Sequence, residues 1–154
     1  MKIALIGVAV LVAVALVAGG LLAFRSDGAS GETGYAAQLD SLCADSRKQV
    51  EALGQPSEIP IGKLYPGTVR IGRAFLEEAK ALTPPPEEAA AAKTFIRERG
   101  LYYDGLEYAY EFFTTQKNGV AFVRVVDGAT ANLGKAETAA KGIGAPECAL
   151  RPFE

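Results

Sequence analysis

The chain has 154 residues, a formal net charge of −2, and neither histidine nor tryptophan. A slightly acidic chain of mixed charge lacks the basic surface of nucleic-acid-binding domains, so we expect no nucleic-acid partner. The missing histidines exclude the commonest general base, the usual zinc ligand and a Ser-His-Asp triad. We therefore expect a protein that is not an enzyme and that carries no metal or other cofactor.

The sequence begins with a long apolar segment. Every residue of Ile3–Phe24 is apolar or glycine, and as a helix this segment would span about 33 Å, enough for a hydrocarbon core of about 30 Å. Lys2 precedes it, and acidic residues soon offset Arg25, which favours export of the C-terminal remainder. We expect residues 1–24 to be a transmembrane signal-anchor helix in the cell membrane. Cleavage near the small residues Ala18, Gly19, Gly20 and Ala23, which would secrete the remainder, stays open as an alternative.

The rest of the chain is predicted to be a tether and one helical domain. Residues 25–33 are polar and glycine-rich, as flexible linkers are. Apolar residues then recur at three-to-four spacing between Pro and Gly breaks, which predicts four helices. Their expected ranges are 34–53, 61 or 66 to 82, the proline step at 84–86 to 117, and 120–141. Short loops between amphipathic helices predict an all-α domain over 34–154, an extracytoplasmic up-down-up-down four-helix bundle.

The third helix has the strongest start signal in the sequence. Thr83 is a favourable N-cap. The residues Pro84, Pro85 and Pro86 suit a first helical turn, because the N–H groups of that turn have no partner within the helix and proline has no N–H. Glutamates at 87 and 88 would interact favourably with the positive end of the helix dipole. We therefore expect this helix to begin directly after Thr83.

The only two cysteines, Cys43 and Cys148, lie near the two ends of the expected domain. An even number of cysteines in an exported chain favours a disulfide, with two free buried thiols as the alternative. In an up-down-up-down bundle the fourth helix ends where the first begins. The two cysteines are then able to meet, so their placement agrees with the helix count.

Two charged residues are predicted to pair across the last hairpin. Arg99 lies within the apolar arc of the third helix, nineteen residues before the Asn118 turn, and Glu137 lies nineteen residues after it. An antiparallel hairpin places them at the same height. Because buried charges are usually paired, we expect a partly buried Arg99–Glu137 ion pair that fixes the helix register, or that holds an anionic ligand.

The third helix also carries a second apolar stripe, formed by Leu101, Tyr108 and Phe112. Their spacings of seven and four place them on one face, away from the core-facing residues. We interpret the stripe as a surface for a protein partner, with scattered surface residues as the alternative. The neighbouring carboxylates Asp104, Glu107 and Glu111 are interpreted as a solvated acidic face and not as a metal site.

The order of these features resembles a group of uncharacterised helical proteins of high-GC Gram-positive bacteria, membrane-anchored or secreted and linked by a disulfide. The resemblance rests on the apolar segment Ile3–Phe24, Cys43, the Thr83–Pro86 step and the small residues of Gly142–Cys148. It implies a membrane-anchored or secreted disulfide-linked bundle and no particular activity. The tail at 149–154 is longer than such chains often have.

The sequence therefore predicts a membrane-anchored, non-enzymatic cell-envelope module that binds another envelope protein. The alternative is an extracytoplasmic small-ligand binding or sensor domain. That alternative requires a cavity within the bundle, lined by tyrosines and by Arg99.

Overall fold

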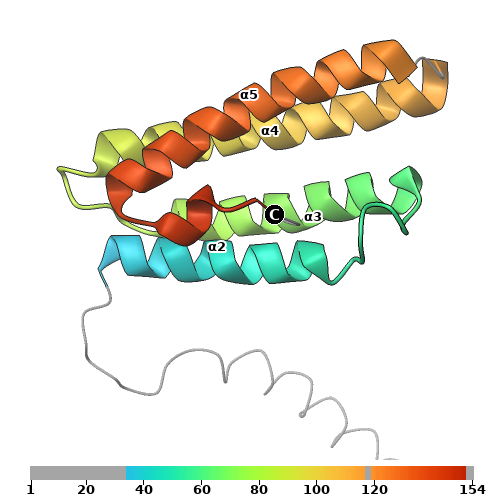
Figure 1. The fold of residues 1–154 in the computed structure, drawn as a ribbon. Coiled ribbons are helices and arrows are strands. Elements are labelled where there is room, and N and C mark those ends of the chain that lie inside the picture. Colours follow the sequence, from blue (N-terminus) through green and yellow to red (C-terminus); the bar gives the residue numbers. More distant parts are fainter. Residues whose placement is uncertain (1–33, 117–118, 152–154) are drawn as a thin grey trace, which may run out of the picture. The chain divides into compact units, whose positions relative to one another are not determined.

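The computed structural model describes residues 34–116 and 119–151, which form a bundle of four α-helices (Figure 1). The helices are α2 (Tyr35–Glu51), α3 (Ile61–Ala81), α4 (Ala89–Gln116) and α5 (Gly119–Ile143), and a short 3₁₀ helix, η1 (Pro146–Ala149), comes after them. Consecutive helices run in opposite directions (Figure 1). The predicted all-α bundle is confirmed, and within the described ranges there is no strand.

Helix α3 starts at the earlier of its two predicted positions. Pro66 lies inside the helix, where it lacks the N–H that would bond to Gly62 four residues before it. The first turn is nevertheless closed, because the backbone amides of Lys63 and Leu64 both donate to the carbonyl of Pro60. The helix therefore tolerates a proline near its N-terminal end.

Helix α4 starts later than predicted. Thr83 and Pro84 are non-helical, and a turn closed by the Glu88 amide on the Pro85 carbonyl (3.0 Å) precedes the helix. The predicted helix start at the proline step is wrong. A residue that precedes a proline is pushed into extended conformation, so in a run of three prolines the first two cannot adopt helical dihedrals easily.

Helices α4 and α5 form the most extensive contact in the bundle, and small residues allow their close approach. Gly105 of α4 lies against Ala129 of α5, where an added Cβ would come within 2.6 Å of the alanine side chain. Further along α5, Ala136 and Ala140 are fully buried. The glycine that weakens α4 by intrinsic propensity is therefore required by packing.

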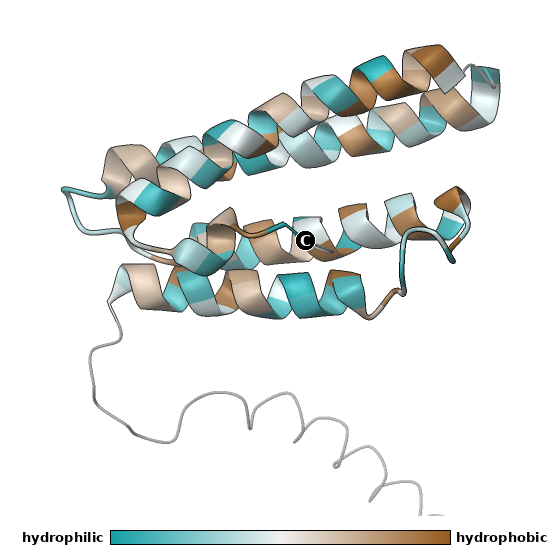
Figure 2. Ribbon diagram, viewed as in Figure 1, coloured by the Kyte–Doolittle hydropathy of each residue, from teal (hydrophilic) through white to brown (hydrophobic). Residues whose placement is uncertain are grey.

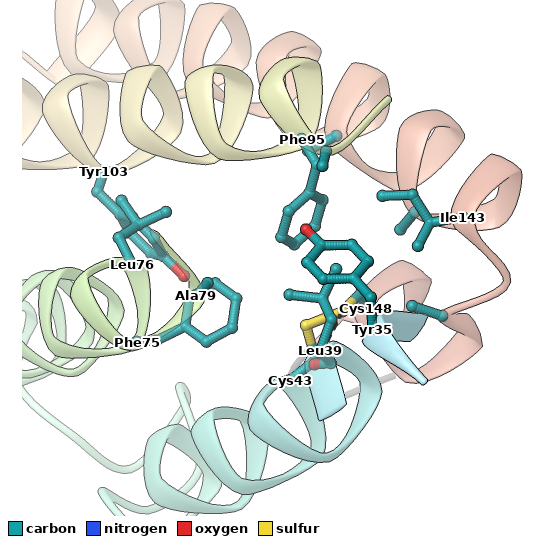
Figure 3. Packing of buried hydrophobic residues seen from close by; sticks show 14 of the residues in the cluster. Tyr35, Leu39, Cys43, Phe75, Leu76, Ala79, Phe95, Tyr103, Ile143 and Cys148 are labelled. Atoms are coloured by element: carbon teal, nitrogen blue, oxygen red, sulfur yellow. Dashed lines mark hydrogen bonds between the residues drawn. A yellow bond between two sulfur atoms is a disulfide. The ribbon is translucent and has the colours of Figure 1, made fainter. Parts of the chain in front are cut away.

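The four helices form two hairpins, α2–α3 and α4–α5. The core lies where these hairpins meet (Figure 3). Phe95 of α4 points toward Leu39 of α2, and both side chains are fully buried. The Phe95 ring also meets the Phe75 ring of α3 edge to face, with centroids 6.1 Å apart. Burial of large side chains of this kind contributes several kcal/mol each, so truncation of Phe95 to alanine would cost about 3 to 5 kcal/mol.

The disulfide between Cys43 and Cys148 is confirmed, with a Cα–Cα distance of 5.0 Å. It fastens η1 to α2, beside Leu39 (Figure 3). The same contact holds two polar interactions: the Glu147 amide donates to Asp40 (2.6 Å), and the Glu147 carboxylate pairs with Arg47 (2.6 Å). The short helix η1 packs on both α2 and α5 and so closes the bundle at this end.

The expected transmembrane helix at 1–24 and the tether at 25–33 lie outside the described residues. Hydrophilic and apolar residues alternate along each described helix (Figure 2). Among these helices, none combines the length and apolarity needed to cross a membrane.

Candidate ligand-binding cleft

An open cleft of about 250 Å³ lies between the two hairpins. All four helices contribute to its apolar walls, with Val50 on α2, Leu64 on α3, Leu106 on α4, and Val126 and Leu133 on α5. These residues follow the core-facing periodicity of their helices, so rigid elements set the shape of the cleft. Its polar groups are few, and they include two tyrosine hydroxyls and one guanidinium.

Tyr65 and Tyr102 line the cleft from α3 and α4. The Tyr65 ring packs on the Phe122 ring of α5, with centroids 5.4 Å apart, and Tyr102 packs on Tyr103 at 5.1 Å. Burial raises the pKa of Tyr65, and it raises the pKa of Tyr102 from 10.0 to about 12, with a smaller contribution from Tyr103. Both hydroxyls therefore stay protonated at neutral pH and act as hydrogen-bonding groups.

Arg151, just beyond η1, also lines the cleft. Its Nε donates to Oε1 of Glu137 (2.7 Å) and its Nη2 donates to Oε2 (3.2 Å). This two-point pairing holds the guanidinium plane in a fixed orientation. The carboxylate also balances its charge, so Arg151 adds direction to the cleft wall more than net charge.

A small recess of about 30 Å³ adjoins the cleft. Arg99 and Arg47 both line it, and Val50, Thr68 and Tyr102 line the recess and the cleft alike. The recess therefore adjoins the cleft at Tyr102 and extends toward α2 and η1, which contribute Arg47 and Glu147 to its lining.

Arg99 is a buried cation, with only 8% of its surface exposed. Its Nη2 donates to the Cys148 carbonyl at 2.7 Å, and its guanidinium carbon lies 5.7 Å from the Phe95 ring centroid. Its Nε is buried without an acceptor. Burial of an N–H without a partner costs about 1 to 3 kcal/mol, which makes this group an unusual feature of the core.

The predicted ion pair between Arg99 and Glu137 is wrong. Arg99 donates to the Cys148 carbonyl, and Glu137 pairs with Arg151. The expected pairing considered only the α4–α5 hairpin, whereas the actual partners come from the residues that follow α5. That segment returns across the bundle end and brings Arg151 to Glu137 and a backbone carbonyl to Arg99.

The predicted partner stripe lies on α4, apart from the residues that line the cleft. Leu101 is 43% exposed and Tyr108 is 57% exposed, whereas Phe112 is half-buried. The rings of Tyr108 and Phe112 lie 6.2 Å apart. Tyr108 and Phe112 are thus neighbours on α4, and the role of the stripe as a partner surface stays a prediction.

The acidic face of α4 has a partner that the sequence did not reveal. Arg73 of α3 pairs with both Asp104 and Glu107. Such exposed pairs contribute little to stability. Within residues 34–116 and 119–151, no cluster of His, Cys, Asp and Glu is arranged to hold a metal ion.

A buried carboxylate was also missed. Glu98 is 3% exposed, and its Oε1 accepts from both Nε (3.0 Å) and Nη2 (2.6 Å) of Arg97. Lys135 of α5 lies 3.9 Å from its other oxygen. The sequence places Glu98 directly before Arg99, which was expected to be buried. In the structure Glu98 lies on the side of α4 that faces α5.

Comparison with models of known protein families, with curated proteins and with solved structures finds no match. The function is therefore inferred from the residues and geometry of this chain alone.

Proposed function

We propose that the helical domain binds a small, largely apolar ligand in the cleft between its two hairpins. The observation that carries this proposal is the cleft itself, with apolar walls on four helices and a few polar groups. Ligand sites in proteins commonly have this composition. A volume of about 250 Å³ exceeds the roughly 150 Å³ of an engineered protein cavity that binds benzene.

The polar groups of the cleft favour binding over catalysis. Tyr65 and Tyr102 keep their protons at neutral pH, since the ordinary pKa of tyrosine is about 10 and burial raises both pKa values further. A general base needs a pKa near the working pH. Thr130 donates to the backbone carbonyl of Val126. These groups suit recognition of a ligand, and we propose that the protein is not an enzyme.

We further propose that residues 3–24 anchor the chain in the cell membrane and that the domain lies outside the cytoplasm. The Cys43–Cys148 disulfide supports this placement, because disulfides persist mainly in oxidising compartments. The test is labelling of intact cells with a membrane-impermeant maleimide, before and after reduction. Labelling only after reduction is expected; labelling only after lysis would place the domain inside the cell.

The binding proposal is tested with the full chain purified in detergent and labelled with ¹³C at tyrosine. A library of small apolar and aromatic fragments is added, and the ring resonances are monitored by NMR. Ligands in the cleft are expected to shift Tyr65 and Tyr102, whereas Tyr108 on the exposed face of α4 serves as an internal control. If no fragment shifts Tyr65 or Tyr102 more than Tyr108, the cleft is not a ligand site.

A matched pair of substitutions sharpens this test. Val126→Phe places a ring in the cleft and is expected to abolish fragment binding, because Val126 lines it. Val123→Phe makes the same change at an exposed position one turn earlier on α5 and is expected to leave binding unchanged. Equal binding by both variants would contradict the proposed location.

A second candidate function, docking of an envelope protein on Leu101, Tyr108 and Phe112, is favoured by the exposure of Leu101 and Tyr108. The two functions are compatible, since the stripe lies outside the cleft lining. A photo-crosslinking residue at position 108 is expected to give one discrete adduct in cells. The same residue at Thr114, an exposed position on the same helix, is the control. Identical adduct patterns at both positions would argue against a specific surface.

A further inference from the structure

We infer that the ligand of the cleft carries a carboxylate group, which binds in the recess between Arg99 and Arg47, while its apolar part occupies the cleft. This inference rests on the proposed ligand-binding function and names the chemical class of the ligand. The two spaces are adjacent, because Val50, Thr68 and Tyr102 line both. One elongated molecule is therefore able to occupy both.

Two arginines that line the recess each carry a buried donor that lacks an acceptor. The Nε groups of Arg99 and Arg47 are both buried without a hydrogen-bond partner, and both residues line the recess. Buried donors are almost always satisfied in folded proteins. Two residues that line one small space thus each carry an unsatisfied donor, which favours an acceptor bound beside them.

The charge distribution favours an anionic acceptor at Arg99. Arg47 is already paired with Glu51 (3.2 Å) and Glu147 (2.6 Å). Among the residues that the structure describes, by contrast, no carboxylate lies within salt-bridge distance of Arg99. Hydrogen bonds between ionised partners are about twice as strong as those between neutral ones. A carboxylate in the recess would thus pair with the buried charge of Arg99.

The size and surroundings of the recess separate a carboxylate from larger anions. A volume of about 30 Å³ holds roughly two water-sized groups, which matches the two oxygens of a carboxylate and not the four of a phosphate. Glu147 also lines the recess and would repel a doubly charged group more strongly than a singly charged one. The recess therefore selects a single, compact negative charge.

The cleft determines the rest of the ligand. Its apolar walls and its tyrosine rings suit one aromatic ring or a short hydrocarbon chain. The probe that fits this description is 3-phenylpropionate, a ring joined to a carboxylate by two methylenes. Its amide and its alcohol keep the ring and chain and remove the charge, so they are matched controls.

The test measures the affinity of the full chain in detergent for the three probes, corrected for partitioning into empty micelles. The carboxylate is expected to bind about tenfold more tightly than the amide, as one additional charge-assisted hydrogen bond would give. In Arg99→Gln the preference is expected to fall to about one. Arg124→Gln makes the same change at an exposed arginine of α5 and is expected to keep the preference.

A measurement on the unmodified protein guards against a variant that fails to fold. With ¹⁵N-labelled arginine, the Nε–H resonance of Arg99 is expected to shift when 3-phenylpropionate is added, and to shift much less with the amide. The resonance of Arg124 is expected to stay in place in both titrations.

The outcomes separate this inference from the proposed function. If the amide and alcohol bind as tightly as the carboxylate, and Arg99 does not respond, the cleft is a ligand site but the carboxylate class is wrong. If none of the three probes binds while other fragments shift Tyr65 and Tyr102, the inference is likewise overturned and the proposed function survives. If no fragment of any kind binds, both fail.

Discussion

The aromatic ring of Tyr103 on α4 lies directly against Gly72 on α3, at a point where an added Cβ would come within 2.2 Å of the ring. Both residues are buried, so neither helix can move aside without loss of packing. The absence of a side chain at position 72 is therefore the feature that lets α3 and α4 approach at this level of the core.

Gly72→Ala is expected to destabilise the fold by about 1 to 3 kcal/mol, the usual cost of overpacking. Helix propensity alone predicts the opposite sign, since alanine exceeds glycine by about 1 kcal/mol in a helix interior. Gly128→Ala in α5 is the matched control, because no atom lies within 4 Å of its added Cβ. We expect this control to be neutral or stabilising in thermal unfolding measured by circular dichroism. Destabilisation of both variants alike would show that the Tyr103 contact is not the cause.

Removal of the disulfide is expected to lower the free energy of unfolding by about 4 to 5 kcal/mol. The two cysteines are 105 residues apart, and closure of so long a loop restricts the unfolded chain strongly in the chain-entropy account. The measurement compares the wild type, the reduced wild type and a Cys43→Ser/Cys148→Ser variant in denaturant. A loss below about 1 kcal/mol in both altered forms would mean that the contacts of η1 with α2 hold without the bond.

The fold is expected to lose stability as the pH rises from about 10 to about 12. The pKa of Tyr102 rises on folding from 10.0 to about 12 because burial disfavours the phenolate. The unfolded chain therefore releases this proton first, so the contribution of Tyr102 is complete below pH 10 and declines above it. A shift of this size is worth about 2 to 3 kcal/mol. Tyr102→Phe is expected to flatten part of this decline in unfolding measured across the alkaline range. Part of the slope is expected to remain, since burial also raises the pKa of Tyr103.

Arg97→Gln is expected to cost about 1.5 to 3 kcal/mol, because it removes both close charged donors from the buried carboxylate of Glu98. Lys135→Gln is expected to cost less, since that ammonium lies 3.9 Å from the other carboxylate oxygen. Urea unfolding of the two variants gives the comparison, with Arg124→Gln as an exposed control. A cost for Lys135→Gln equal to or above that for Arg97→Gln would reverse the assignment of the main partner.

Local patterns predicted the helices well, because each helix has a clear apolar period and ends at Gly or Pro. The predicted range 120–141 became Gly119–Ile143, and the disulfide was expected from two cysteines at the ends of an antiparallel fold. The start of α4 was missed for a local reason. The preference for proline in the first turn of a helix concerns a single proline. In Pro84–Pro86 each proline also pushes the residue before it into an extended conformation.

The candidate site was much less accessible from the sequence. Tyr102 was recognisable as a core-facing residue, but the cleft also requires Tyr65 from α3 and Arg151 from beyond α5. Their meeting depends on how two hairpins are spaced, which no pattern within one helix encodes. Arg99 was identified as a buried charge, and its partner was missed because that partner is a backbone carbonyl, which every residue has.

The bond between Cys43 and Cys148 also determines how the molecule would respond to tension. A force pulling on the two ends of the chain passes through the first turns of α2, crosses the sulfur bridge and leaves after Cys148, so the intervening helices carry no load along their backbone. About 350 Å of contour length, at about 3.4 Å per residue, is thereby locked away until the bridge is reduced. The cleft and the recess are shaped mainly by residues inside that protected loop, and their geometry would survive mechanical strain that unravels an unbridged bundle.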